Sequence, residues 1–168
     1  MKVALSSLMV LGWLLLSGYL LWQDQRSVVG TFDPELRWQQ QATDNLELAS
    51  VNTASGESLM QLLHVIDPSC RCHRKQQQHQ QALQQSFAAI PQQTLSIAEA
   101  RQLGLSIPAA PMAIVLNGDE LVYAGPYTVG PVCGSGDGWV ERLLRGEIQL
   151  AGAWLNGESN SCRCLQSV

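Results

Sequence analysis

Residues 3–22 form an uncharged, strongly apolar stretch, and they place the first constraint on the structure of the chain. These twenty residues are rich in leucine, follow Lys2, and end before the polar segment 23–26. An apolar run of this length spans the hydrocarbon core of a bilayer as a helix. A cleaved secretory signal is the competing interpretation, but its apolar core usually has only about 7 to 15 residues, and no A-x-A cleavage site follows here. We therefore expect an uncleaved membrane anchor.

The charges that flank this stretch bear on its orientation. Lys2 and the free amine lie on one side and Arg26 lies on the other, so the difference in positive charge that sets the orientation is small. With the N-terminus inside, the chain is a single-pass protein of the inner (cytoplasmic) membrane, and its C-terminal domain faces the periplasm. Cysteine pairs persist as disulfides in such an oxidising space. The net charge of −4 argues against a nucleic-acid partner, which requires clustered Lys and Arg.

The remainder of the chain has the length of one domain of about 140 residues. We divide the sequence into a signal anchor (1–26), a tether with an N-terminal extension (27–56), a globular α/β domain (57–146) and a C-terminal tail (147–168). Residues 27–31 read as the tether itself. In the extension, Asp33 and Pro34 predict a helix start, as cap and first helical residue.

Strand and helix patterns alternate through the globular domain. Residues 59–66 are apolar on both faces, as a covered central strand is. Residues 73–87 carry an apolar stripe at helical spacing, which predicts a helix that ends near Ile90 and Pro91. Ser96 to Glu99 forms a capping box and predicts a short helix that ends at Gly104.

A hairpin signal follows. Residues 112–116 and 121–124 are apolar and flank Asn117-Gly118, a strong turn dipeptide for two antiparallel strands. After a glycine-rich loop, Asp137 or Ser135 could cap a last helix that begins near Trp139. The tail beyond residue 146 is weakly patterned and predicts no further element.

Two cysteines lie where the first strand gives way to the first helix, in the segment 67–75, DPSCRCHRK. A cysteine at the start of a helix faces unpaired backbone N–H groups and the positive end of the helix dipole, and both favour the thiolate. Cys70 is therefore the candidate attacking thiolate, and Cys72 is the candidate resolving or tuning thiol. Arg71 and Arg74 could raise the local positive potential.

The order of these elements resembles the thioredoxin fold. In that superfamily the reactive cysteine follows the first core strand at a helix N-terminus, and a cis-proline opens the hairpin strand beside it. Cys70 and Pro111 match these positions, with Pro108 as a competing assignment. More narrowly, DPSCRC, a GPY segment, a glycine-flanked cysteine and a terminal CxC resemble an uncharacterised bacterial family of membrane-anchored thioredoxin-like domains. The resemblance implies an α/β thioredoxin-like fold over about residues 59–145, behind an N-terminal transmembrane helix.

The CxC spacing departs from the CxxC of thioredoxin oxidoreductases, because Cys72 comes one residue too early and His73 stands in place of the second cysteine. A disulfide between Cys70 and Cys72 would close a small, strained ring, and strain makes a disulfide easier to reduce. Such a pair could act as an oxidant or isomerase. It could equally never close, with Cys70 resolved by a thiol elsewhere.

The three remaining cysteines are Cys133, Cys162 and Cys164, and five in total leave one thiol after two pairs form. The terminal CxC could fold back and exchange with Cys70 as an internal electron relay. Alternatively, one tail cysteine bonds Cys133 and pins the C-terminus in a structural disulfide. Both arrangements are compatible with the sequence.

We predict thiol–disulfide exchange in the cell envelope, without a required cofactor and with envelope protein thiols or disulfides as partners. The first alternative is a thiolate site for zinc or copper. Its ligands would be drawn from Cys70, Cys72, Cys133, Cys162 and Cys164, with His73 as an added nitrogen ligand. The second is a non-catalytic module that binds an envelope partner beside Pro111. His64, inside the first strand, is expected to be a hydrogen-bonded interior or edge residue.

Overall fold

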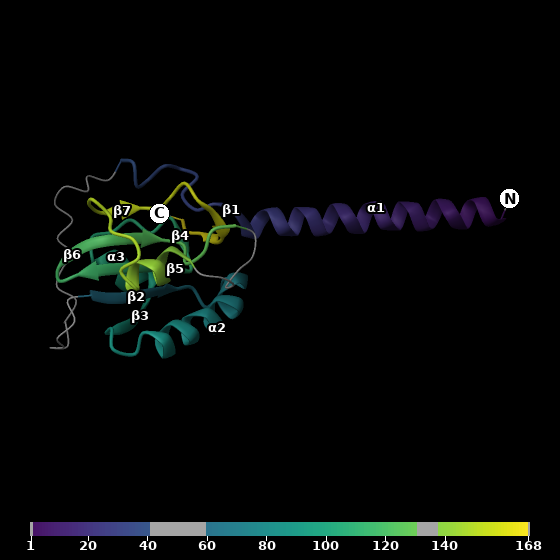
Figure 1. The fold of residues 1–168 in the computed structure, drawn as a ribbon. Coiled ribbons are helices and arrows are strands. Elements are labelled where there is room, and N and C mark those ends of the chain that lie inside the picture. Colours follow the sequence, from purple (N-terminus) through teal and green to yellow (C-terminus); the bar gives the residue numbers. More distant parts are fainter. Residues whose placement is uncertain (1, 41–59, 131–137, 168) are drawn as a thin grey trace.

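The computed structural model describes residues 2–40, 60–130 and 138–167. A long helix, α1 (Lys2–Val28), projects from one end of a domain of strands and shorter helices (Figure 1). Its segment Ser6–Gln23 is long and apolar enough to cross a membrane, judged by length and composition. The chain thus combines one apolar N-terminal helix with a mixed α/β domain.

The centre of the domain is a mixed five-stranded sheet in the order β3-β2-β5-β6-β7. Its strands are β2 (Met60–Ile66), β3 (Gln92–Ser96), β5 (Met112–Asn117), β6 (Glu120–Gly125) and β7 (Trp154–Leu155). Strand β2 is antiparallel to β5. It is parallel to β3, because α2 (Arg71–Ser86) forms the crossover between these two strands. Strands β5 and β6 form a hairpin, and β7 adds a parallel edge strand.

Helices cover both faces of this sheet. Alternate residues of β2 point to opposite faces, so Leu62 and Leu63 belong to different hydrophobic clusters. The Leu62 face packs against Leu83 of α2 and Val140 of α4 (Trp139–Leu144). The other face packs against α3 (Ile97–Gln102) and against Phe32 and Trp38 of the N-terminal extension. Burial of β2 on both faces confirms the prediction of a covered central strand.

Two local predictions are confirmed in detail. Ser96 caps α3: its side chain accepts from the Glu99 amide at 3.3 Å, and the Glu99 carboxylate accepts from the Ser96 amide at 2.7 Å. Gly104 follows α3 with φ +85°, a left-handed conformation that suits glycine. Gly118 turns the β5–β6 hairpin with φ +61°. In each case neighbouring residues decide the geometry.

The helix predicted from Asp33 and Pro34 is wrong. This segment forms turns instead, because the Asp33 carboxylate accepts from the Trp38 amide at 2.8 Å. The Asp33 amide in turn donates to the Gly157 carbonyl at 2.8 Å. Contacts with the C-terminal tail thus replace the contacts of a helix cap.

Other boundaries also differ from expectation. Helix α2 ends at Ser86 rather than near Ile90, and the unpredicted strand β3 follows it. The cap of α4 is Gly138, whose amide donates to the Glu141 carboxylate at 3.0 Å. The predicted caps Ser135 and Asp137 lie outside the described residues.

The tail forms strands that the sequence did not predict. After β7, strand β8 (Asn160–Cys162) pairs with β1 (Val29–Thr31), which follows α1 directly where a tether was expected. Strand β9 (Cys164–Leu165) then pairs with β4 (Ala109–Ala110). The tail therefore links the base of α1 to the segment that precedes Pro111.

A candidate thiol site at the start of helix α2

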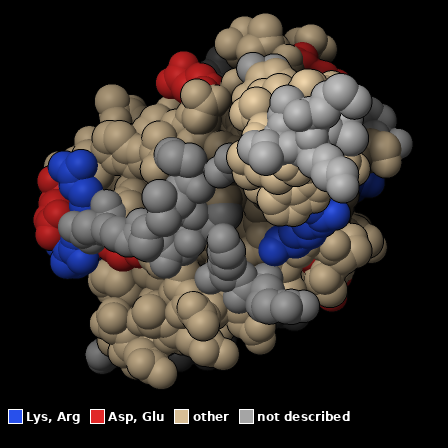
Figure 2. All heavy atoms as spheres, turned by 90° about the vertical axis from the view of Figure 1, so that its right-hand side faces the viewer, with Lys and Arg blue, Asp and Glu red and all other residues tan. Residues whose placement is uncertain are grey.

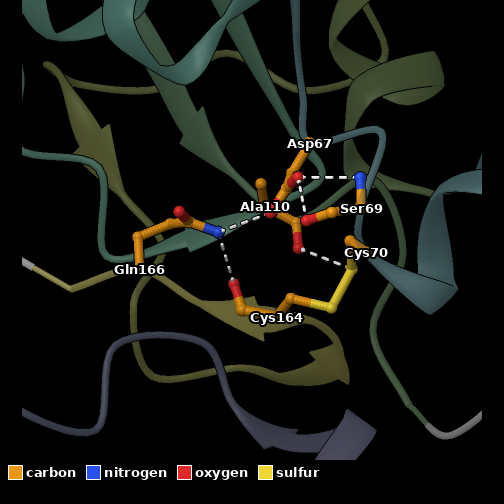
Figure 3. Close-up of a disulfide and its surroundings, with 6 residues drawn as sticks. All are labelled: Asp67, Ser69, Cys70, Ala110, Cys164 and Gln166. Atoms are coloured by element: carbon orange, nitrogen blue, oxygen red, sulfur yellow. Dashed lines mark hydrogen bonds between the residues drawn. A yellow bond between two sulfur atoms is a disulfide. The ribbon is translucent and has the colours of Figure 1, made fainter.

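The turn before α2 is organised by Asp67. One oxygen of its carboxylate accepts from the Ser69 amide at 2.9 Å and from the Ser69 hydroxyl at 2.6 Å, and the Asp67 carbonyl accepts from the Cys70 amide at 3.0 Å (Figure 3). The Ser69 hydroxyl is the main cause that lowers the pKa of the Asp67 carboxyl. Cys70 occupies the extended N-cap position of α2, with φ −71° and ψ 130°. The sequence prediction of a cysteine at a helix start is thus confirmed.

Cys70 is bonded to Cys164 of the tail. The two sulfurs form a disulfide that joins residues 94 positions apart, with their Cα atoms at 5.8 Å (Figure 3). Cys164 lies opposite Ala110 in the β4–β9 pair, so the strand register presents it to α2. Cys70 is buried and Cys164 is partly exposed. The terminal CxC therefore reaches Cys70, as one of the two alternatives from the sequence required.

Cys72 is a buried cysteine beside this bond and is not part of a disulfide. The Sγ atoms of Cys70, Cys72 and Cys164 all lie within 4.8 Å of one another. The disulfide between Cys70 and Cys72 considered from the sequence does not form, because Cys70 has the tail cysteine as its partner. Cys162 is also in a disulfide, and Cys133 lies outside the described residues.

The peptide bond between Ala110 and Pro111 is cis, which is the geometry that the sequence resemblance assigned to Pro111. The Ala110 carbonyl oxygen lies 3.6 Å from Cys70 Sγ (Figure 3). A disulfide sulfur has no proton to donate, so this is a contact in the oxidised state, and Cys70 could donate to Ala110 only as a thiol. The backbone carbonyl of Pro108, the competing assignment, instead accepts from the Gln166 backbone amide at 2.9 Å.

The tail is held over the site by polar contacts as well as by the disulfide. The Gln166 side-chain amide donates to Asp67 at 3.0 Å and to the Cys164 carbonyl at 3.3 Å (Figure 3). Arg37 donates to the Gln166 carbonyl at 2.9 Å, and Arg101 donates to the Ser167 carbonyl at 2.6 Å. Asp67 thus positions both cysteines, since it fixes the turn before Cys70 and also holds the tail.

Arg163 brings a buried cation to the cysteine cluster. It lies between the two tail cysteines and is only 9% exposed. Burial lowers the pKa of its guanidinium, and an electrostatic interaction with Cys72 opposes this shift. Its Nε is buried without a hydrogen-bond partner among the described residues, and its Nη2 would lie 2.6 Å from a Cβ added at Gly30. A glycine at position 30 is what lets the guanidinium approach β1.

A buried polar network fixes α2 over the sheet. His64 Nδ1 lies 2.7 Å from the Tyr127 hydroxyl, and His64 Nε2 lies 2.9 Å from Gln92 Oε1. Since Oε1 can only accept, Nε2 carries the proton, and Tyr127 donates to Nδ1. The Gln80 amide of α2 donates to the same hydroxyl at 3.0 Å. His64 is fully buried, and burial lowers its pKa, which confirms the prediction of a hydrogen-bonded interior residue.

The family follows from a match over most of the chain. A family model described as a domain of unknown function, DUF6436, matches residues 38–166. The chain belongs to the DUF6436 family. The matched segment contains all five cysteines and leaves the apolar N-terminal helix outside. No curated protein and no solved structure matches this DUF6436 chain.

The DUF6436 site has the donor atoms for a metal only in its reduced state. Three thiolates within 4.8 Å could coordinate one soft or borderline ion. In the disulfide state two of these sulfurs share a bond and offer no thiolate. His73 and Cys162, both named from the sequence as further ligands, are not part of this cluster among the described residues. Within residues 2–40, 60–130 and 138–167 the candidate metal ligands are thus Cys70, Cys72 and Cys164.

Sequence reasoning missed two residues of the DUF6436 site. Asp67 could have been found, because an Asp followed by Pro and Ser is a typical pattern for a side chain that caps its own turn. Arg163 carried no such signal, since the sequence pointed to Arg71, which lies between Cys70 and Cys72, and to Arg74, which follows them. Figure 2, a view along α1, shows charged side chains only in small separate groups, so the described residues form no broad basic patch on that face.

Proposed function

We propose that this DUF6436 protein carries out thiol–disulfide exchange in the cell envelope, with the Cys70–Cys164 disulfide as its reactive bond. The observation that supports it is the combination at the start of α2: a disulfide at the N-cap of a 16-residue helix, with the sulfur of Cys72, which is in no disulfide, within 4.8 Å. Structural disulfides need no third thiol. Exchange uses one, because a thiolate must attack one of the two bonded sulfurs.

The exposure of the two bonded cysteines determines which of them a partner attacks first. Cys164 is partly exposed and Cys70 is buried, so a partner thiolate reaches Cys164 first. Its attack forms a mixed disulfide with Cys164 and expels Cys70 as a thiolate. The N-terminus of α2 stabilises that leaving group. In the reverse direction, reduced Cys70 attacks a partner disulfide, and Cys164 or Cys72 resolves the intermediate.

The fold that best fits this chemistry is a thioredoxin-like one. A parallel β2–α2–β3 unit, the antiparallel β5–β6 hairpin and α4 on the same face as α2 support it. The cis peptide at Pro111 lies beside Cys70 through the Ala110 carbonyl. The apolar helix α1 supports a membrane-anchored protein with its domain in the periplasm. Partners would be envelope proteins with reactive thiols or disulfides.

The experiment is a redox titration of the full chain in detergent micelles. The protein is equilibrated in glutathione buffers of graded potential, quenched in acid, alkylated and mapped by mass spectrometry. Cys70 and Cys164 should convert together and reversibly between thiol and disulfide while the domain stays folded. Cys70→Ser should abolish reduction or isomerisation of a disulfide-containing protein substrate. Unchanged activity of this variant would remove Cys70 from the reaction and refute the proposal.

A thiolate metal site is the second candidate, and the proximity of the three sulfurs favours it. The reduced chain is titrated anaerobically with Zn²⁺ or Cu⁺ and examined by native mass spectrometry. One bound ion that protects Cys70, Cys72 and Cys164 from alkylation would support this function. Cys72→Ser should then weaken binding, because two thiolates remain. Full alkylation in the presence of metal would exclude the site.

A further inference from the structure

We propose that Cys72 opens the Cys70–Cys164 disulfide from within the protein. Its sulfur attacks Sγ of Cys164, so that the tail is transferred from Cys70 to Cys72 and Cys70 becomes a free thiol. This deepens the proposed function and rests on it, because a freed Cys70 matters only if Cys70 reacts with partners. It assigns Cys72 a role other than resolving a partner disulfide.

The attacking sulfur is already in place. Cys72 Sγ lies within 4.8 Å of both bonded sulfurs, in a cluster that is packed with Cys162, Val28 and Val29. Cys72 is only 2% exposed, so an external thiol or disulfide has little access to it. A new S–S bond of about 2 Å needs a side-chain movement of a few ångströms at most. Cys72 thus has a nearby sulfur to react with and little contact with solvent.

Backbone geometry selects Cys164 as the sulfur that is attacked. Cys70 is the N-cap of α2 and Cys72 is its second residue, so the ring closed by a disulfide between them would be small and strained. A bond between them would require the first turn of α2 to rearrange. Cys164 belongs to a separate strand and can be reached without that change. Attack on Cys164 also expels Cys70, the sulfur at the helix N-terminus.

The step is balanced without any external reagent. Cys72 gives up its thiol proton, the bond between Cys70 and Cys164 breaks, and a bond between Cys72 and Cys164 forms. Cys70 leaves with the electron pair and takes up one proton. One disulfide and one thiol are present before and after, so nothing is oxidised or reduced overall. The protein therefore exchanges the buried thiol of Cys72 for the thiol of Cys70 at the N-cap of α2.

Arg163 is a positioning residue for this step. Its guanidinium is buried, interacts electrostatically with Cys72, and belongs to the same strand region as Cys164. Negative charge passes from Cys72 to Cys70 during the attack. The Arg163 cation is shielded from water, and it stabilises the charge on Cys72 at the start of the step. Gly30 permits this placement, since a larger residue would clash with the guanidinium.

Disulfide mapping tests the transfer directly. Cys70→Ser is expressed in the full chain, purified in detergent, oxidised mildly and digested for mass spectrometry. We expect a disulfide between Cys72 and Cys164, the product of the proposed step. Two free thiols at these positions in the oxidised, folded variant would overturn the inference. The matched control is Cys72→Ser, in which Cys164 should be bonded to Cys70 alone.

Alkylation of the wild-type chain measures the rate at which the tail is transferred from Cys70 to Cys72. Without reductant, slow alkylation should label Cys70 as well as Cys72, and a disulfide between Cys72 and Cys164 should accumulate. Label confined to Cys72 would overturn the inference. Arg163→Gln should slow labelling of Cys70 about tenfold, and Arg163→Lys should restore most of the rate. Equal rates in all three proteins would remove Arg163 from the step.

The two proposals fail in different ways. Internal transfer with no exchange between Cys70 and glutathione would refute the proposed function and leave the inference standing. Exchange with glutathione together with a static Cys72 would do the reverse. Both results come from the same set of peptide maps.

Discussion

Replacement of Tyr127 by phenylalanine should lower the free energy of unfolding by about 3 kcal/mol, because it removes one hydroxyl that serves two buried partners. Tyr127 is 1% exposed. Its hydroxyl donates to His64 Nδ1 at 2.7 Å and accepts from the Gln80 amide at 3.0 Å. The phenyl ring fills nearly the same volume, so the change affects polar satisfaction more than packing.

The magnitude follows from the two groups that lose their partner. A buried donor or acceptor left unsatisfied costs about 1–3 kcal/mol, and here one of each is left in the same site. Their sum is about 2–6 kcal/mol, and the lower desolvation cost of phenylalanine brings the expected loss to about 3 kcal/mol. No water from outside replaces the hydroxyl easily, since His64 is fully buried and Gln80 is 7% exposed.

Urea unfolding of the full chain in detergent micelles, followed by tryptophan fluorescence, measures this loss as a shift of the midpoint at constant slope. Gln80→Met in the Tyr127→Phe background is the matched control, because it removes one of the two unsatisfied groups. It should recover about 1 kcal/mol. A loss below about 0.5 kcal/mol for Tyr127→Phe would refute the assignment of this network, since that is the range of a neutral surface substitution.

Three further outcomes are expected. Burial lowers the pKa of His64, so the contribution of the neutral side chain to the free energy of unfolding is fully present above the unfolded-state pKa of about 6.5. This contribution is lost as the pH falls below that value, by up to about 1.4 kcal/mol per pH unit. Unfolding measured between pH 7.5 and 5 should show this slope, and His64→Gln should reduce it. Asp67→Asn should speed amide hydrogen exchange at Gln166 several-fold, because an amide NH₂ then faces the Gln166 side chain; an unchanged rate would contradict the contact. Cys164→Ser should make Cys70 open to alkylation in the native protein, whereas protection of Cys70 would show that the tail covers it without the disulfide.

Elements with strong local signals could be predicted from the sequence. The β5–β6 hairpin depends on Gly118 between two apolar runs, and α3 depends on the reciprocal bonds of Ser96 and Glu99. The position of Cys70 at a helix start also follows from its neighbours, because Asp67 and Ser69 shape the turn. Each of these structures is specified within a few residues of chain.

The tail could not be predicted in this way. Strands β8 and β9 have three and two residues, too few for an apolar pattern, and their partners β1 and β4 are distant in sequence. The same holds for the Cys70–Cys164 pair, which spans 94 positions. Arg163 was missed because its place beside Cys72 depends on the β1–β8 pairing. Asp33 was wrongly predicted to cap a helix, because its backbone amide instead donates to the Gly157 carbonyl of the tail.

The direct passage from α1 into β1 sets where a partner can meet the cysteines. The apolar segment ends at Gln23, and Val28 of the cysteine cluster follows only five residues later, a rise of about 7.5 Å along a helix. With α1 in a bilayer, the sulfurs of the cysteine cluster would lie in the layer of lipid headgroups or just above it. Encounters would then be governed by lateral diffusion in the membrane plane, and the domain could not extend outward to reach soluble partners. A partner with its own reactive cysteine at the same height above the bilayer would have a large advantage in local concentration.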